Sequence, residues 1–213
     1  VIKRTTNGGT DWISVYNFGI SEVVTSLVSS SAGIFARTGF YGGTTGKIVF
    51  SDDNGANWSV LTSSLGAVMA MAANSDGDLY AGNQNGDIYK SVDDGGTWAQ
   101  IRSGSNRDIG AIALDADGGI YIGVENEGVY YSDDDGDSLS QINNGMGNKP
   151  VSAILLVNDT LLFAGTPQDG VFRTTNGGNN WADITRGLGW DNVGAGALKQ
   201  YNDYLYCGVG DGV

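Results

Sequence analysis

The chain contains one short sequence motif five times, at nearly even spacing. The copies read TTNGGTDW, SDDNGANW, SVDDGGTW, SDDDGDSL and TTNGGNNW, and they begin at Thr5, Ser51, Ser91, Ser132 and Thr174. The shared pattern is Ser or Thr, any residue, Asp or Asn, any residue, Gly, two residues, and then Trp, which Leu139 replaces in the fourth copy. The spacing averages about 42 residues, which is typical of a four-stranded β-propeller blade.

Each repeat has the pattern of four short strands. In the third repeat, AVMAMAAN at 67–74 is followed by the turn NSDGD and by LYAGN, IYKS and TWAQI. Asp-Gly between alternating apolar residues is a strong hairpin signal. No helical periodicity persists anywhere along the chain. The sequence therefore predicts an all-β fold, a β-propeller of about five four-stranded antiparallel blades forming a single domain over residues 1–213.

The two ends of the chain match different halves of a repeat. The opening VIKRTTNGG matches VFRTTNGG of the fifth repeat, so the chain begins inside the third strand of a blade. The final YLYCGVGDGV matches LLFAGTPQDGV and stops where that third strand would begin. Two strands from each end would complete one blade, and we expect a ring closed by these shared strands. The alternative is a piece of a larger ring.

The motif residues have a structural rationale. The Asp or Asn side chain can accept backbone N–H bonds within a tight loop, and Gly supplies a conformation closed to residues with a Cβ. The Trp then begins the outer strand and buries a large apolar area. The residues expected to fill these roles are Asn7, Gly9, Trp12, Asp53, Gly55, Trp58, Asp93, Gly95, Trp98, Asp134, Gly136, Asn176, Gly178 and Trp181.

Composition excludes several classes of function. With 24 acidic against 11 basic residues and a net charge of −13, no Lys/Arg cluster can neutralise phosphates, so a nucleic-acid partner is not expected. The longest apolar run, around Val151, is too short to insert into a membrane. The chain has no histidine and one cysteine, Cys207, which excludes a disulfide, a His-containing triad and a Cys/His zinc site.

No cofactor or metal is expected. Calcium binding by the acids Asp133, Asp134, Asp135 and Asp137 is the alternative, but Tyr131 occupies the position where an EF-hand loop would need an acid. The acidic, Asn/Gly/Ser/Thr-rich composition indicates an extracellular or cell-surface protein of the bacterial secreted type, and we expect the chain to be part of a larger protein.

The five motifs resemble Asp-box, or BNR, repeats, which occur in sialidases, xyloglucanases, sortilin and photosystem II assembly factors. The resemblance covers essentially the whole chain. In those families the box folds a hairpin away from the active face. The resemblance therefore implies a structural role for the motif and places any site on the opposite face.

In a propeller, that opposite face is formed by the loops between blades and by the loops joining second to third strands. Aromatic rings beside arginines and acids suit a carbohydrate ligand, because rings stack on sugars while charged groups bond hydroxyls. Loops of this kind supply the candidate binding residues Arg37, Phe40, Tyr41, Arg102, Arg107, Asp108, Glu125, Glu127, Arg186, Trp190 and Asp191. By contrast, Arg4 and Arg173 recur just before the motif and are interpreted as scaffold.

Three functions fit these features. The favoured one is a non-catalytic extracellular recognition propeller that binds a glycan or protein, because the repeats are regular and poor in insertions. The second is a glycoside hydrolase. A sialidase-like enzyme would need an arginine cluster and a Tyr–Glu pair, and a xyloglucanase-like enzyme would need two facing carboxylates from among Asp108, Glu125, Asp169 and Asp191. The third is a structural repeat module of a larger surface protein.

Overall fold

The computed structural model of the chain describes residues 1–17, 22–40, 46–62, 64–104, 106–188 and 194–210, with the side chains of residues 40 and 210 excepted. Throughout these ranges the regular elements are β-strands, which confirms the predicted all-β class. Within the same ranges, no helix has the length and apolarity needed to cross a membrane.

The strands form four four-stranded antiparallel sheets, flanked by a two-stranded sheet at each end of the chain. The first two complete sheets contain β3 (Glu22–Ser29), β4 (Ile34–Phe40), β5 (Gly46–Ser51) and β6 (Ser59–Thr62), then β7 (Val68–Ala73), β8 (Leu79–Asn83), β9 (Ile88–Ser91) and β10 (Ala99–Arg102). The next two contain β11 (Ile109–Leu114), β12 (Ile120–Val124), β13 (Gly128–Ser132) and β14 (Ser140–Gln141), then β15 (Ala153–Leu156), β16 (Leu162–Thr166), β17 (Gly170–Thr174) and β18 (Ala182–Asp183). The flanking pairs are β1 (Ile2–Arg4) with β2 (Ile13–Tyr16), and β19 (Gly194–Tyr201) with β20 (Tyr204–Gly210).

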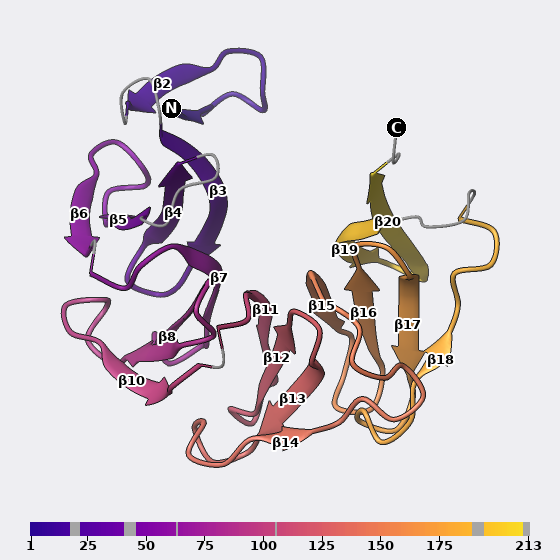
Figure 1. The fold of residues 1–213 in the computed structure, drawn as a ribbon. Coiled ribbons are helices and arrows are strands. Elements are labelled where there is room, and N and C mark those ends of the chain that lie inside the picture. Colours follow the sequence, from indigo (N-terminus) through magenta and orange to yellow (C-terminus); the bar gives the residue numbers. More distant parts are fainter. Residues whose placement is uncertain (18–21, 41–45, 63, 105, 189–193, 211–213) are drawn as a thin grey trace.

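The sheets follow one another as blades along an arc, each blade holding one sequence repeat (Figure 1). The predicted closure by shared strands is not observed. Within the described residues, β1–β2 and β19–β20 are separate two-stranded sheets, and Figure 1 shows them at the two ends of the arc with open space between them. The first pair corresponds to the third and fourth strands of a blade, and the second pair to the first and second strands, as the end matches predicted.

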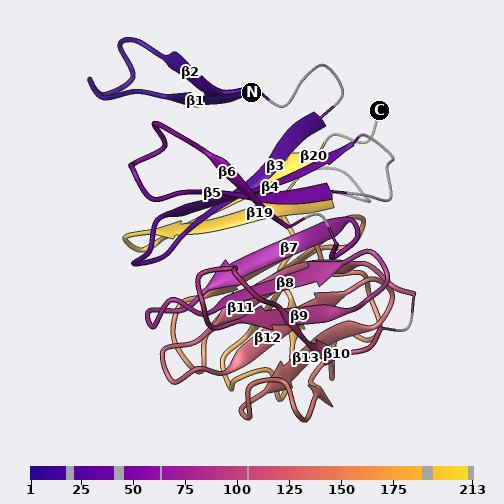
Figure 2. The same cartoon turned by 90° about the vertical axis from the view of Figure 1, so that its left-hand side faces the viewer.

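The apolar core lies between neighbouring blades. One cluster joins Phe35 and Ile48 of the first complete blade to Leu79 of the second, and another joins Tyr80 of the second blade to Ile122 of the third. Similar clusters fill the remaining interfaces, including those made by the two half-blades. Figure 2 shows the sheets stacked face to face in this way. Each blade therefore depends on its neighbours for burial, as repeat architectures do.

In the second, third and fourth complete blades, the second strand comes close to the next blade at one glycine. Its glycine is essential there, because an added Cβ would lie 2.3 Å from Ile109 at Gly82, 2.6 Å from Val151 at Gly123 and 2.5 Å from the Ala195 carbonyl oxygen at Gly165. The residue two positions before this glycine is aromatic, and its side chain is almost completely buried. Its four copies, Phe35, Tyr80, Tyr121 and Phe163, are 0%, 1%, 3% and 9% exposed.

The motif loops join the third strand of each blade to the fourth and share one hydrogen-bond pattern. In the loop after β5, the Ser51 hydroxyl donates to Asp53 at 2.8 Å and accepts from the Gly55 N–H at 2.8 Å, while Asp53 accepts from the Asn57 N–H at 2.8 Å. Equivalent bonds occur in the other four loops. In the loop after β5, the hydrogen bonds that Asp53 accepts, first from Asn57 and then from Ser51, lower the pKa of Asp53 to about 2.

One motif position was not recognised from the sequence. The residue before the motif glycine has a positive φ in every copy, with values of 57° at Asn54 and Asp94 and 61° at Asp135. Glycine stands there in the first and fifth copies, at Gly8 and Gly177. Asn, Asp and Gly tolerate this left-handed conformation better than other residues, so the position is restricted rather than free.

The expected burial of the motif tryptophans is correct for three of the four. Trp181 is buried, and Trp58 and Trp98 are half-buried against apolar clusters. Trp12 is 58% exposed, so the expectation is wrong there. The reason is that each motif tryptophan packs on the preceding blade, and no described blade precedes β1–β2.

Candidate functional site

The loops between blades and the loops joining second to third strands lie on one side of the arc, because successive antiparallel strands alternate in direction. A cavity of about 520 Å³ opens among them. Its walls come from the starts of β7 and β11, the loop before β15, and the β12–β13 and β16–β17 loops. The lining residues are Met69, Asp108, Gly110, Glu125, Asn126, Pro150, Val151, Ser152, Pro167 and Gln168.

Two carboxylates of the predicted set, Asp108 and Glu125, meet in this cavity. The Glu125 N–H donates to the Asp108 carbonyl oxygen at 2.9 Å, so the β12–β13 loop is fixed against the strand entry of β11. Both residues are half-buried. Burial, and secondarily the charge of Glu125, raises the pKa of Asp108. The cavity therefore offers hydrogen-bond acceptors and negative charge beside the apolar surfaces of Met69 and two prolines.

Arg102 and Glu127 are brought together beside the cavity and satisfy each other. Arg102 lies 3.5 Å from the Glu127 carboxylate and donates to the Gly86 carbonyl at 3.0 Å. The Tyr130 hydroxyl donates to the same carboxylate at 3.1 Å, and the Arg102 guanidinium lies 5.4 Å from the Tyr130 ring centroid. This cluster joins the second complete blade to the third.

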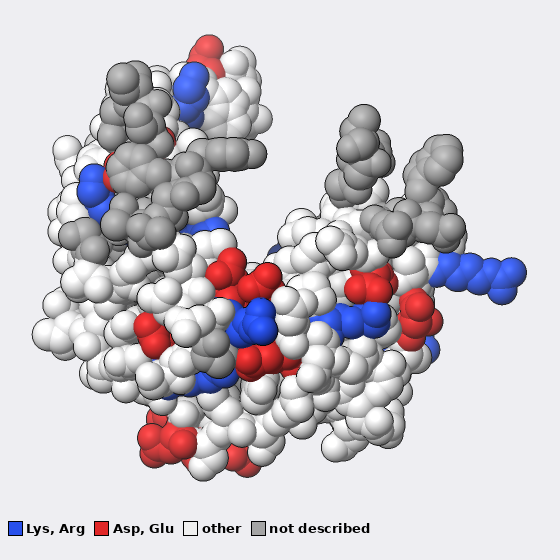
Figure 3. Space-filling view, in the orientation of Figure 1, with Lys and Arg blue, Asp and Glu red and all other residues white. Residues whose placement is uncertain are grey.

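A second ion pair was not predicted from the sequence. Lys149, in the loop before β15, contacts Asp169 of the β16–β17 loop at 2.5 Å and lies 5.9 Å from the Phe172 ring centroid. Figure 3 shows basic and acidic side chains interspersed across the middle of the face that is turned toward the viewer. The positions of the two residues in their repeats could have predicted this pair, because both lie in loops expected on the same face.

Arg37 does not line the cavity. It occupies the position at which the later blades have the close-contact glycine of the second strand, and its guanidinium donates to the carbonyl of Val68 in the next blade. Burial lowers the pKa of Arg37. A long side chain thus bridges two blades where glycine elsewhere lets them touch, and this geometry indicates a scaffold role.

The other predicted residues fall into two groups. Arg107 and Arg186 are exposed, and neither lines the cavity. The side chains of Phe40, Tyr41, Trp190 and Asp191 lie outside the described part of the chain. Arg37, Arg102, Arg107 and Arg186 are not assembled into the arginine cluster of a sialidase-like site, and Tyr41, considered for its Tyr–Glu pair, lies outside the described residues.

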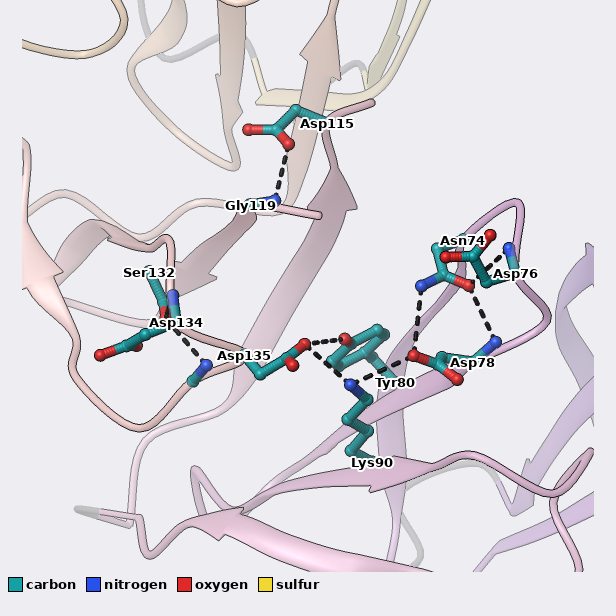
Figure 4. A network of polar contacts seen from close by, with 11 residues as sticks. Asn74, Asp76, Asp78, Tyr80, Lys90, Asp115, Gly119, Ser132, Asp134 and Asp135 are labelled. Carbon is teal, nitrogen blue, oxygen red and sulfur yellow. Dashed lines mark hydrogen bonds and ion pairs between the residues drawn. The ribbon is translucent and has the colours of Figure 1, made fainter. Parts of the chain in front are cut away.

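Two of the four acids considered for calcium, Asp134 and Asp135, have other contacts. Asp134 closes its own motif loop through the Ser132 hydroxyl at 2.7 Å. Asp135 binds Lys90 of the neighbouring blade at 2.7 Å and accepts from the Tyr80 hydroxyl at 3.0 Å (Figure 4). Over the described ranges, no group of three or more His, Cys, Asp or Glu side chains is arranged to hold a metal ion.

The same network joins two blades. Lys90 also contacts Asp78 at 3.1 Å, and its side chain is largely buried. Burial alone would lower the pKa of Lys90, but its hydrogen bonds to Asp135, Tyr80 and Asp78 outweigh that effect and raise it. Arg4 at the equivalent position donates to the Asn54 carbonyl of the next blade at 3.0 Å, which agrees with its interpretation as scaffold.

Comparison with known proteins identifies the architecture. No protein-family profile matches the sequence, and no curated protein sequence matches it significantly. Among solved structures, YCF48 from Cyanidioschyzon merolae is similar with a TM-score of 0.69 at 17% identity, covering 99% of this chain and 74% of that one. The GH74 xyloglucanase from Xanthomonas campestris gives 0.68 at 17% identity, covering 82% of this chain and 33% of that one.

Two further structures extend the range of similar proteins. The extracellular domain of BT4673 from B. thetaiotaomicron has a TM-score of 0.70 at 13% identity, covering 92% of this chain and 27% of that one. YCF48 bound to D1 peptide gives 0.67 at 14% identity, covering 92% of this chain and 64% of that one. The chain thus spans about a third of the xyloglucanase that it matches. At these identities the similarity shows a β-propeller fold and leaves the chemistry to the site.

Proposed function

We propose that the chain is a non-catalytic recognition propeller that binds a protein or glycan ligand in the cavity lined by Asp108 and Glu125. One observation carries the proposal: the cavity lies on the predicted face and combines two adjacent carboxylates with the apolar surfaces of Met69, Pro150 and Pro167. Concave, partly apolar sites with a few convergent polar groups are typical of ligand recognition. The peptide complex of the similar YCF48 supports a peptide as ligand.

The charge of the site limits the ligand. Two carboxylates line the cavity and no Lys or Arg is among its described lining residues. An anionic ligand would meet repulsion there, whereas amines, guanidinium groups and hydroxyls would donate hydrogen bonds. The ligand is therefore a basic peptide segment or a neutral glycan, and an acidic sugar is disfavoured.

We propose that the five motifs place the chain in the Asp-box class, because in each motif loop the Ser or Thr hydroxyl donates to the side-chain oxygen of the Asp or Asn two residues later. We also propose that residues 1–213 act as one domain of an extracellular or cell-surface protein. The match to an extracellular domain supports this location.

A glycoside hydrolase of the xyloglucanase type is the second candidate. The observation that favours it is the raised pKa of Asp108 beside Glu125, since a general acid must stay protonated next to an ionised carboxylate. We prefer the recognition proposal for two reasons. The backbones of Asp108 and Glu125 are hydrogen-bonded directly to each other. The ion pairs around the cavity, Arg102 with Glu127 and Lys149 with Asp169, hold loops in place.

Binding and turnover measurements on the same variants test the two candidates. Asp108→Asn and Glu125→Gln should each weaken binding to hits from a peptide and neutral-glycan array at least tenfold, while Arg186→Ala, an exposed change outside the cavity, leaves it unchanged. Fluorogenic β-glucosides should give no turnover. Turnover that Asp108→Asn abolishes would establish the hydrolase instead, and unchanged binding in both cavity variants would refute the site.

A further inference from the structure

One cross-strand pair of side chains recurs at the interfaces between the complete blades. It joins the aromatic residue of the second strand to the residue just before the motif in the third strand. The pairs at the three interfaces between complete blades are Phe35 with Phe50, Tyr80 with Lys90, and Tyr121 with Tyr131. Because these pairs share one backbone arrangement, comparing them shows what each set of side chains can bind.

The second of these interfaces holds an ammonium group. The Lys90 ammonium lies 3.1 Å from the carboxylate of Asp78 in its own blade and 2.7 Å from that of Asp135 in the next motif loop (Figure 4). It also lies 5.4 Å from the centroid of the Tyr80 ring, whose hydroxyl donates to Asp135 at 3.0 Å. A tyrosine and two carboxylates thus bind a cation that the chain itself supplies.

The third interface has acceptors for such a cation but lacks the ammonium. Tyr131 stands in place of Lys90, and Gly177 stands in place of Asp135. The centroids of the Tyr121 and Tyr131 rings lie 4.6 Å apart. Tyr121 is only 3% exposed, yet its hydroxyl has no hydrogen-bond partner among the described residues. Tyr131 is half-buried, so its side of the pair is open to a ligand.

Carboxylates lie beside the two tyrosines. One oxygen of Asp115 accepts from the Gly119 N–H at 2.6 Å (Figure 4), and its other oxygen, Oδ2, has no hydrogen bond among the described residues. A Cβ at Gly119 would lie 2.3 Å from Asp115 Oδ2 and 2.8 Å from the Tyr131 hydroxyl oxygen, so the glycine keeps the space between these two oxygens open. Burial raises the pKa of Tyr121 to about 12, and the charges of Asp115 and Asp159 add to this effect, so both carboxylates lie near the ring.

We propose that the Tyr121–Tyr131 interface binds an alkylammonium group, the head of a small amine or of a lysine side chain, in the place that the Lys90 ammonium occupies one interface earlier. The free oxygen of Asp115 and the two phenol oxygens accept its hydrogen bonds, and the aromatic rings attract its charge. None of the ion pairs among the described residues involves Asp115 or Asp159, so a ligand cation would be the first to neutralise them. The site lies on the motif-loop side of the blades and is separate from the cavity among the inter-blade loops.

The first interface shows that packing between blades does not need the two hydroxyls. Phe35 and Phe50 pack there with ring centroids 4.7 Å apart, close to the 4.6 Å of the tyrosine pair. Tyr121→Phe combined with Tyr131→Phe should therefore keep the fold while it removes both phenol oxygens. Tyr131→Lys should place an internal ammonium where Lys90 has one and so fill the site. Unchanged melting temperatures would confirm that these variants fold.

Isothermal titration calorimetry of the 213-residue chain at low ionic strength tests the proposal. The probes are n-butylammonium and a blocked glycine-lysine-glycine peptide, and the same peptide with acetylated lysine is the ligand control. We expect saturable binding of n-butylammonium, weakened at least tenfold in Asp115→Asn, in the double phenylalanine variant and in Tyr131→Lys, and no binding of the acetylated peptide. Equal affinities for the two amines would identify a small amine as the ligand, and at least tenfold tighter binding of the lysine peptide would identify a lysine side chain.

Asp94→Asn is the matched control and should leave the affinity unchanged. It removes a motif-loop acid at the Phe35–Phe50 interface, and Asn54 occupies the equivalent position with the same φ of 57°. The loss of affinity on Asp115→Asn should be the same in the native chain and in Asp108→Asn, because the two carboxylates belong to separate sites. Binding that only Asp108→Asn removes would place the amine in the cavity, which overturns this site and supports the other. Absence of saturable binding, or affinities that Asp115→Asn and Tyr131→Lys leave unchanged, would also overturn the proposal.

Discussion

Two tryptophans at the same motif position should differ sharply in their contribution to stability. Trp181 and Trp12 each follow the motif glycine by three residues, yet Trp181 is 5% exposed and Trp12 is 58% exposed. The Trp181 indole N–H also donates to the Ile142 carbonyl at 2.6 Å. We therefore compare Trp181→Ala with Trp12→Ala, because the local sequence is nearly the same and the packing is not.

The magnitude follows from buried area. Full burial of a tryptophan removes about 200 Å² from water, which corresponds to about 5 kcal/mol at about 25 cal/mol per Å². Trp181→Ala should therefore lower the free energy of unfolding by about 3–5 kcal/mol, in the usual range for truncation of a buried aromatic residue. Trp12→Ala should lower it by no more than about 2 kcal/mol, because less than half of that side chain is covered.

Urea unfolding followed by far-ultraviolet circular dichroism measures both values. Equal losses for the two variants would refute the reasoning, since they would mean that the motif loop, rather than contact with the preceding blade, determines the contribution of the tryptophan.

Three further outcomes are expected. The pKa of Asp53 is about 2 in the folded state, below its unfolded value. Ionised Asp53 therefore stabilises the fold fully above pH about 4, and this stabilisation is lost as the pH falls toward 2. Melting temperatures measured from pH 5 to 2 should show the loss in the native chain and less of it in Asp53→Asn. A double-mutant cycle of Lys90→Met and Asp135→Asn should give a coupling energy of about 1 kcal/mol in urea unfolding, whereas additive effects would exclude a clasp between these blades. Burial and the charge of Glu125 disfavour the ionised form of Asp108 in the folded state. Asp108→Asn should therefore raise the melting temperature at pH 7 while it weakens ligand binding. A lowered melting temperature would instead show that Asp108 stabilises the fold.

Much of the fold could be predicted from local sequence. The motif loops need only residues close in sequence, because Ser51, Asp53 and Gly55 satisfy one another within a few positions. The hairpins likewise depend on turn residues between short apolar strands. Local bonds of this kind recur wherever the same residues recur, which is why five repeats predicted blades of the correct order and strand content.

The candidate site could be predicted only in part. Two of the predicted residues, Asp108 and Glu125, do meet in one cavity, and their role in binding stays a prediction. The same reasoning gave Arg37 a binding role, although it bridges two blades through the Val68 carbonyl, and it missed Lys149 with its partner in another loop. The sequence does not distinguish a residue that faces a ligand from one that bridges two blades, because the partner of a bridging residue lies in a different repeat.

By itself, then, the sequence determined the blade: its four strands, its clasped loop, and the glycine and aromatic residue that prepare its second strand for contact. Only the tertiary structure decided how the blades are placed. The curvature of the arc results from side-chain packing at each interface between blades, and small rotations accumulate along the array until they determine whether its ends meet. Tyr206 carries the same local signal as Tyr80, yet one side chain is exposed and the other buried, because a neighbouring blade covers only the second.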